Sequence, residues 1–191
     1  MANVMVDLET LGTVPGCVLL SYGGVIFSTA GGDLGEELYV VFNRADCEKA
    51  GLHVSQDTLD WWMRQSPESR QVLADAADKK RSVPLRTGLV MINEFMSRNG
   101  GKSLKIWGNG ADFDNPILRC AYHAADVQPF AGNYNGRCYR TAKEFWGIVG
   151  VPAPQRIQRG TGTHHNALDD AKAQAEHLQA IVAHYRSHLA A

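Results

Sequence analysis

The chain has 191 residues, of which 45% are hydrophobic and 20% are charged. This balance predicts a globular protein with enough apolar material for a full core, and the length suits one domain over residues 1–191 or a domain with a helical appendage. The net charge is -1, with 19 Lys and Arg against 20 Asp and Glu, which excludes a strongly basic nucleic-acid-binding protein. Any attraction to phosphate must therefore come from a local basic patch or from bound metal.

The cysteines and the hydropathy pattern narrow the class of protein further. The four cysteines lie far apart and form no Cys-x-x-Cys pair, which excludes a zinc-ribbon spacing and a dense disulfide framework. No apolar run reaches the ~18 residues that span a bilayer, and no charged N-terminus precedes an apolar stretch typical of a signal peptide. A reduced cytoplasmic protein with no membrane partner is expected.

The first part of the chain predicts three antiparallel strands joined by short turns. These strands are expected over 1–7, 17–28 and 36–42, because each segment is rich in apolar and β-branched residues. Gly23 and Gly24 inside the second strand indicate a bulge or a close backbone approach. Short segments rich in Gly and Pro separate the strands.

Helical periodicity dominates the rest of the chain. Six helices are expected, over 58–64 (with Ser55 as N-cap), 67–77, 84–98, 115–125, 141–149 and 167–189. A fourth strand is expected over 104–107, and loops over 130–135 and 152–163. A three-strand meander followed by helices that alternate with a strand predicts a central mixed sheet flanked by helices.

Two carboxylates lie one residue apart at the end of the first expected strand. Residues two apart in a strand point to the same face, so Asp7 and Glu9 share a face. Each raises the cost of ionising the other unless a cation lies between them, and Mg²⁺ or Mn²⁺ prefers oxygen ligands. A solvated strand end is the alternative, because Asp-x-Glu is a common pattern.

A second acidic stretch follows the strand expected over 104–107. Asp112 and Asp114 lie just past its carboxyl end, where sites in α/β sheets are usually found. The alternative for Asp114 is a simple cap of the helix that follows.

A third acidic stretch begins the last expected helix. The helix dipole alone would favour Asp169 and Asp170 at this position. It does not explain the preceding pair His164 and His165, because a cation is unfavourable there. A mobile loop that ends at His165 would let this ring swing over the carboxylates.

Taken together and in order, three motifs resemble those of the DEDDh 3′-to-5′ exonucleases of the ribonuclease H-like superfamily. They are Asp7-x-Glu9, Asn109-Gly110 followed by Phe113-Asp114, and His165-x-x-x-x-Asp170. The segments Asp7 to Gly12, Thr58-Leu59-x-Trp61-Trp62-x-x-Gln65 and Trp107 to Asp114 resemble a narrower branch, the small stand-alone exonucleases of bacteria and their phages. This branch includes the phage exonuclease A type and the bacterial 3′-5′ exoribonuclease-like proteins.

The resemblance implies a ribonuclease H-like fold and a catalytic site that holds two divalent ions, Mg²⁺ or Mn²⁺. It makes Asp7, Glu9, Asp114 and Asp170 the metal-binding carboxylates and His165 the general base. The spacing of the family motifs selects these residues over their neighbours Asp112, His164 and Asp169.

The substrate-binding residues that the resemblance suggests are Thr10, Leu11, Trp61, Trp62, Asn109 and Phe113. Thr10 and Leu11 are expected to touch the terminal sugar and to wedge beside the last base. Trp61 and Trp62 offer flat faces for base stacking, but adjacent helical residues point about 100° apart, so at least one should face a groove. Packing of both away from substrate is the alternative.

Four arginines are candidates for a local basic patch near the phosphates, with an ordinary solvated surface as the alternative. They are Arg137, Arg140, Arg156 and Arg159.

The implied function is a 3′-to-5′ exonuclease that releases nucleoside 5′-monophosphates from single-stranded DNA or RNA ends or from 3′ overhangs. Only the 2′-hydroxyl separates the two polymers at such a site, and the phage-like motifs give a slight expectation of DNA. Many relatives are homodimers, so a homodimer is one of the oligomeric states that the sequence leaves open. The rival functions are a metal-dependent hydrolase of small nucleotides and a non-catalytic nucleic-acid-binding module.

Overall fold

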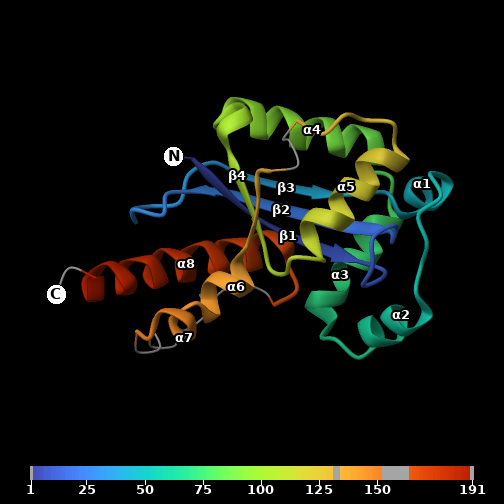
Figure 1. Ribbon diagram of the computed structural model, residues 1–191. Helices are drawn as coiled ribbons and strands as arrows, with labels where there is room; N and C mark the ends of the chain where they lie inside the picture. Colours follow the sequence, from blue (N-terminus) through green and yellow to red (C-terminus); the bar gives the residue numbers. More distant parts are fainter. Residues whose placement is uncertain (1, 131–133, 152–163, 190–191) are drawn as a thin grey trace.

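The structure is a computed structural model that describes residues 2–130, 134–151 and 164–189 (Figure 1). Its five-stranded sheet has the order β3-β2-β1-β4-β5. The strands are β1 (Asn3–Thr10), β2 (Leu19–Phe27), β3 (Glu37–Val41), β4 (Lys105–Gly108) and β5 (Gly136–Cys138). β1 pairs with β2 and β2 with β3 in antiparallel fashion, whereas β4 and β5 join in parallel. The predicted mixed sheet with three antiparallel strands first is confirmed.

Eight α-helices and one 3₁₀ turn are formed by the described residues. They are α1 (Arg44–Lys49), α2 (Gln56–Met63), α3 (Pro67–Ala77), α4 (Leu85–Arg98), η1 (Gly101–Ser103), α5 (Asp114–Ala124), α6 (Tyr139–Glu144), α7 (Trp146–Val149) and α8 (Ala167–Leu189). None of the helices in this part of the chain combines the length and the apolar character needed to cross a bilayer.

Helices cover both faces of the sheet, with α4 and α5 on one side and α8 and α6 on the other (Figure 1). The alternation along β1 divides its side chains between two cores. Val4 and Val6 belong to the larger core, which also holds the apolar side chains of α4, whereas Met5 packs with the buried residues of α8. Asp7 and Glu9 follow Met5 with the same parity, so both lie on the face that α8 covers. The predicted shared face is confirmed.

β2 and the first turn of α8 approach each other closely at Gly23. A Cβ atom at Gly23 would lie 2.2 Å from the carbonyl carbon and oxygen of Ala167 and 2.3 Å from the nitrogen of Leu168. Gly23 is also the cross-strand partner of Asp7. The missing side chain therefore lets the start of α8 lie directly beside the acidic end of β1.

The glycine pair of β2 marks this close approach and not a bulge. Gly23 and Gly24 stay in register with β1, and the register shift falls between Glu9 and Thr10 instead. β2 also begins at Leu19, two residues later than predicted, because Cys17 forms only an isolated bridge with His53.

The other differences from prediction are the end of β1, which extends to Thr10 and not only to Asp7, and several short elements. The sequence pattern missed α1, which has six residues, and β5, whose three residues Gly-Arg-Cys include no β-branched side chain. The helix predicted over 141–149 is two short helices, α6 and α7, that meet at Phe145. The loop predicted over 152–163 lies outside the described residues.

Replacing Gly23 by Ala should destabilise the protein by about 1–3 kcal/mol, because the added methyl group overlaps the backbone of α8. Gly147 is the matched control, since nothing lies within 4 Å of a Cβ atom there. Gly147→Ala should be neutral or stabilising by about 0.4–1 kcal/mol. Thermal and urea denaturation measure both, and equal stabilities for the two variants would contradict the close approach.

Candidate active site

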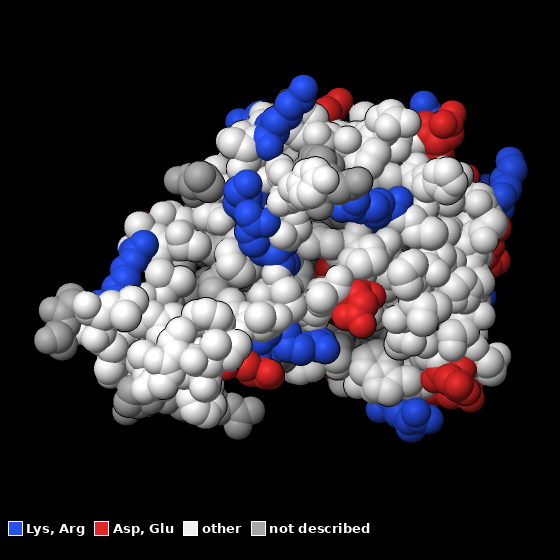
Figure 2. All heavy atoms as spheres, viewed as in Figure 1, with Lys and Arg blue, Asp and Glu red and all other residues white. Residues whose placement is uncertain are grey.

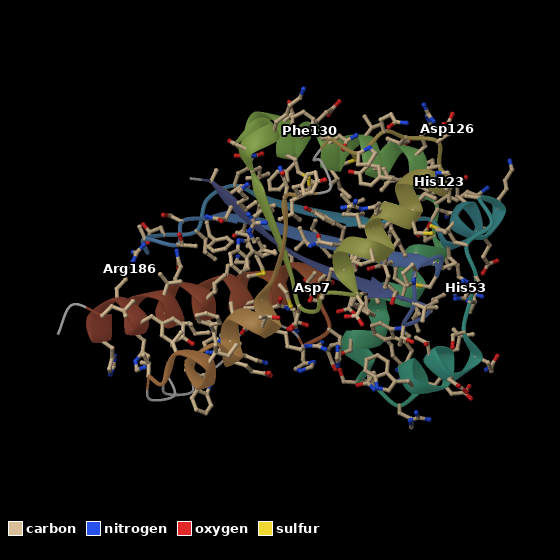
Figure 3. All side chains as sticks on the ribbon, viewed as in Figure 1. Asp7, His53, His123, Asp126, Phe130 and Arg186 are labelled. Atoms are coloured by element: carbon tan, nitrogen blue, oxygen red, sulfur yellow. The ribbon has the colours of Figure 1, made fainter. Side chains whose placement is uncertain are left out.

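A cleft of about 490 Å³ lies at the carboxyl end of β1. Its walls come from β1, from α2, from the loop between β4 and α5, and from the start of α8. Figure 3 shows Asp7 where these elements converge, near the first turn of α8. The cleft brings together all of the predicted site residues except Asp114 and Leu11.

Three carboxylates converge inside this cleft. Oxygen atoms of Asp7, Glu9 and Asp170 lie within 4.8 Å of one another. Two of the residues come from one face of β1 and the third from the first turn of α8, so segments more than 160 residues apart form one group. An all-oxygen donor set of this kind suits a hard divalent cation such as Mg²⁺ or Mn²⁺.

Burial makes ionisation of this group costly. Desolvation raises the pKa of Asp7 well above its usual value, and the charges of Asp114 and Glu9 raise it further. Desolvation also raises the pKa of Glu9 to about 8, with Asp170 and Asp114 contributing. A divalent cation would remove this repulsion, so the electrostatics of these residues fit a metal site.

Asp114 lies beneath the cleft as the first residue of α5, with 1% of its surface exposed. Its carboxylate accepts the backbone N–H groups of Leu8, at 3.1 Å, and Asn109, at 2.7 Å. Burial raises the pKa of Asp114 to about 6, although these N–H groups and Arg140 act in the opposite direction. The N-cap of α5 is Phe113, so the alternative that Asp114 merely caps this helix is wrong.

His165 precedes α8 in a left-handed backbone conformation, with φ of 63°. This conformation is uncommon for a residue with a side chain and is often found at functional sites. The backbone N–H of His165 donates to Asp170 Oδ2 at 3.1 Å, and its ring meets the edge of Trp61 with centroids 4.9 Å apart. α8 itself begins at Ala167, so His165 belongs to the loop and not to the helix.

The two tryptophans of α2 both line the cleft but differ in burial. Trp62 is 1% exposed, and its Nε1–H donates to the carbonyl oxygen of Thr10 at 2.9 Å. Trp61 is half-buried and lines the cleft beside His165. Trp62 therefore attaches α2 to the end of β1, while Trp61 offers a face to whatever occupies the cleft.

The structure separates Thr10 from Leu11. Thr10 lines the cleft, and its hydroxyl donates to the carbonyl oxygen of Gly12 at 2.6 Å. Leu11 is fully buried in the larger core, and its backbone pairs with Val18 and Ser55. The predicted wedge at Leu11 is therefore wrong, because these backbone bonds turn its side chain away from the cleft.

Of the four arginines predicted to form a basic patch, two lie among the described residues. Arg137 and Arg140 are exposed, and Arg140 donates to the carbonyl oxygen of Asn109 at 2.8 Å, next to the cleft. Arg156 and Arg159 lie outside the described residues. Figure 2 shows basic and acidic side chains interspersed on the face in view, so no continuous basic surface dominates this face.

Gln174 is a site residue that the sequence reasoning missed. Its Nε2–H donates to Asp7 Oδ1 at 2.8 Å, and this hydrogen bond lowers the pKa of Asp7 against the effect of burial. Its Oε1 is buried without a hydrogen-bond partner. Gln174 lies four residues after Asp170, on the same face of α8, and this spacing was the available signal.

The chain matches a known protein family over most of its length. Residues 2–182 match the model of the 3′-5′ exoribonuclease Rv2179c-like domain. The chain belongs to this family. A search of curated proteins finds no match. The predicted class of enzyme, a 3′-5′ exonuclease, is thus confirmed at the level of the family.

Two solved exonuclease structures resemble the Rv2179c-like chain in fold. E. coli exonuclease I in complex with a dA16 oligonucleotide is 12% identical with a TM-score of 0.65, covering 94% of this chain and 40% of that one. The nuclease domain of 3′hExo, a DEDDh family member bound to rAMP, is 14% identical with a TM-score of 0.61, covering 97% of this chain and 92% of that one. The chain thus spans about two fifths of exonuclease I. These likenesses confirm the ribonuclease H-like fold.

The stability of the metal-free protein should fall as pH rises from about 4.5 to about 8. Glu9 has a raised pKa in the folded protein, so it stays protonated there while the unfolded chain has already ionised. Unfolding then releases a proton, and stability is lost across this range. Urea denaturation in EDTA at several pH values measures the slope.

Glu9→Gln should flatten that slope, because the amide cannot ionise, and Mg²⁺ should restore stability most strongly at the upper end of the range. Glu94→Gln is the control, since Glu94 is exposed on α4 and lies outside the cleft. A metal-free protein that grows more stable toward pH 8 would contradict the carboxylate repulsion.

Proposed function

We propose that this chain is a divalent-metal-dependent 3′-to-5′ exonuclease that releases nucleoside 5′-monophosphates from single-stranded ends. The observation that carries the proposal is the cluster of Asp7, Glu9 and Asp170 oxygens within 4.8 Å of one another, with His165 beside it in the same cleft. Membership of the Rv2179c-like 3′-5′ exoribonuclease family supports it.

The proposed roles of the four carboxylates differ with their positions in the site. Asp7, Glu9 and Asp170 would hold two divalent ions, Mg²⁺ or Mn²⁺, with Asp114 behind them. When bound, the ions neutralise the phosphate and lower the pKa of the attacking water. The backbone N–H groups of Leu8 and Asn109 keep the Asp114 carboxylate in one orientation, and Gln174 does the same for Asp7.

The proposed general base is His165, which lines the same cleft as the carboxylates. An imidazole is suited to take a proton from the attacking water near neutral pH. The resulting hydroxide adds to phosphorus, the bond from phosphorus to the 3′ oxygen of the preceding nucleotide breaks, and this oxygen takes up a proton from solvent, which balances the proton that His165 then releases to solvent. The products are a nucleoside 5′-monophosphate and a chain shortened by one residue with a free 3′-hydroxyl.

The cleft also offers surfaces for the last nucleotide. Trp61 presents a half-buried ring beside His165, and base stacking on an aromatic ring is worth roughly 1–3 kcal/mol. Thr10, Asn109 and Phe113 line the same cleft and are proposed to contact the sugar and phosphate.

Single-stranded RNA is the polymer that we propose as the preferred substrate. The family is named for exoribonucleases, which weighs against the slight expectation of DNA from the phage-like motifs. A homodimer and a cytoplasmic location stay predictions, which sedimentation analysis and cell fractionation test.

Digestion of 5′-labelled RNA and DNA oligomers of one sequence tests the activity. The intact protein should give a ladder that shortens from the 3′ end with Mg²⁺ or Mn²⁺ and no products with EDTA. His165→Ala should lower kcat by roughly 10²- to 10⁴-fold while Mn²⁺ binding, measured by calorimetry, is kept. Asp7→Asn should lose both activity and Mn²⁺ binding, because Asp7 belongs to the metal-binding group.

His123→Ala is the matched control, since His123 is exposed on α5 outside the cleft, and it should keep full activity. No shortening of either polymer by folded, metal-loaded protein would overturn the proposal. Hydrolysis of mononucleotides alone would then favour the small-nucleotide hydrolase.

Trp61→Ala should raise KM for a single-stranded oligomer by about 5- to 150-fold, because a stacking surface worth roughly 1–3 kcal/mol is lost. Trp61→Phe should recover most of that loss, since it keeps an aromatic face. Met63→Ala, at an exposed position of α2, is the control. Steady-state kinetics on one RNA oligomer compare the variants, and an unchanged KM for Trp61→Ala would remove Trp61 from the substrate contacts.

A further inference from the structure

A second cluster of metal-ligating atoms lies beside the first and shares one carboxylate with it. A ring nitrogen of His164, a ring nitrogen of His165 and a carboxylate oxygen of Asp170 all lie within 4.8 Å of one another. The group of Asp7, Glu9 and Asp170 offers oxygen atoms alone. The second cluster offers two nitrogens and one oxygen, so the two groups favour different ions.

The peptide group that joins His164 to His165 is held in place by hydrogen bonds at both its C=O and its N–H. Ser69 of α3 donates its hydroxyl to the carbonyl oxygen of His164 at 2.7 Å, and the N–H of His165 donates to Asp170 Oδ2 at 3.1 Å. The two imidazole rings lie with centroids 4.0 Å apart and planes inclined by 71°. A site whose backbone is already ordered loses less conformational entropy when a metal binds.

The donor set matches Zn²⁺ and differs from what Mg²⁺ requires. Zinc binds imidazole nitrogen and carboxylate oxygen at about 2.0–2.2 Å in tetrahedral sites, which often use three protein ligands and one water. Ligands of one tetrahedral zinc lie about 3.3 Å apart, so small side-chain rotations close a cluster of this size. Mg²⁺ instead demands octahedral oxygen coordination.

We propose that His164, His165 and Asp170 form a binding site for Zn²⁺, separate from the oxygen-only group and linked to it through Asp170. His164 is exposed, so the site is open to ions from solvent. Occupation by zinc takes the ring nitrogen of His165 and one oxygen of Asp170.

The consequence for catalysis rests on the proposed function. If His165 is the general base, zinc at this site removes the lone pair that would accept the proton from water. It also competes for Asp170, which belongs to both groups. Zinc therefore inhibits the exonuclease even when Mg²⁺ or Mn²⁺ is abundant.

Another histidine pair provides the matched control. His184 and His188 lie four residues apart on α8, with ring centroids 4.4 Å apart, and both are remote from the cleft. Such a pair binds transition metals weakly on its own, so His188→Ala reports any zinc that binds there and not in the cleft.

Metal binding is measured first, on the full chain freed of metal with EDTA. Co²⁺ serves as a spectroscopic probe for zinc sites, and Zn²⁺ displaces it. The intact protein and His188→Ala should show the visible absorption of tetrahedral Co²⁺ with nitrogen ligands. His164→Ala should bind Co²⁺ and Zn²⁺ at least tenfold more weakly. Equal binding by the intact protein and His164→Ala would overturn the proposal.

Inhibition is measured second, with 5′-labelled RNA, saturating Mg²⁺ and increasing Zn²⁺, each variant normalised to its own zinc-free rate. Half-inhibition of His164→Ala should need at least tenfold more zinc than that of the intact protein or His188→Ala. Equal inhibition of all three would place zinc in the oxygen-only group and overturn the inhibitory role. If the protein proves to have no exonuclease activity, the Co²⁺ measurement still decides whether the zinc site exists.

Discussion

Four carboxylates share a small volume at the carboxyl end of β1, and their mutual repulsion is the constraint on which the rest of the site depends. Asp7, Glu9 and Asp170 have oxygens within 4.8 Å of one another, and Asp114 lies buried behind them. Desolvation raises the pKa of Asp7, Glu9 and Asp114, and neighbouring carboxylates raise the pKa of Asp7 and Glu9 further. Carboxylates this close together stay ionised only where hydrogen-bond donors or cations surround them, and the fold supplies the hydrogen-bond donors.

The scaffold meets this constraint by bringing three distant segments to one point. β1 lies at the centre of the sheet and presents Asp7 and Glu9 toward α8. Gly23 leaves room for the first turn of α8, which brings Asp170 and the hydrogen bond from Gln174. Asp114, at the start of α5, accepts hydrogen bonds from the backbone N–H groups of Leu8 in β1 and of Asn109, the residue after β4. The same geometry explains why His165, in the loop before α8, lies beside the carboxylates.

The sequence by itself determined the parts that depend on local periodicity and spacing. Alternation along β1 was enough to place Asp7 and Glu9 on one face, because side chains in a strand repeat every two residues. The longer helices followed from their apolar repeats and caps, and three ordered motifs indicated the exonuclease class that the Rv2179c-like family match confirms. Short elements without a full period, such as α1 and β5, escaped this reasoning.

Only the tertiary structure decided which neighbours each side chain meets. Leu11 follows the acidic motif directly, yet backbone pairing with Val18 and Ser55 turns it into the core. Gln174 belongs to no sequence motif, yet the packing of α8 against β1 lets its side chain donate a hydrogen bond to Asp7. The role of Gly23 likewise depends on a helix that begins 144 residues later, at Ala167. Contacts between segments so far apart in the chain depend on how the sheet and helices pack, and local sequence patterns do not contain that information.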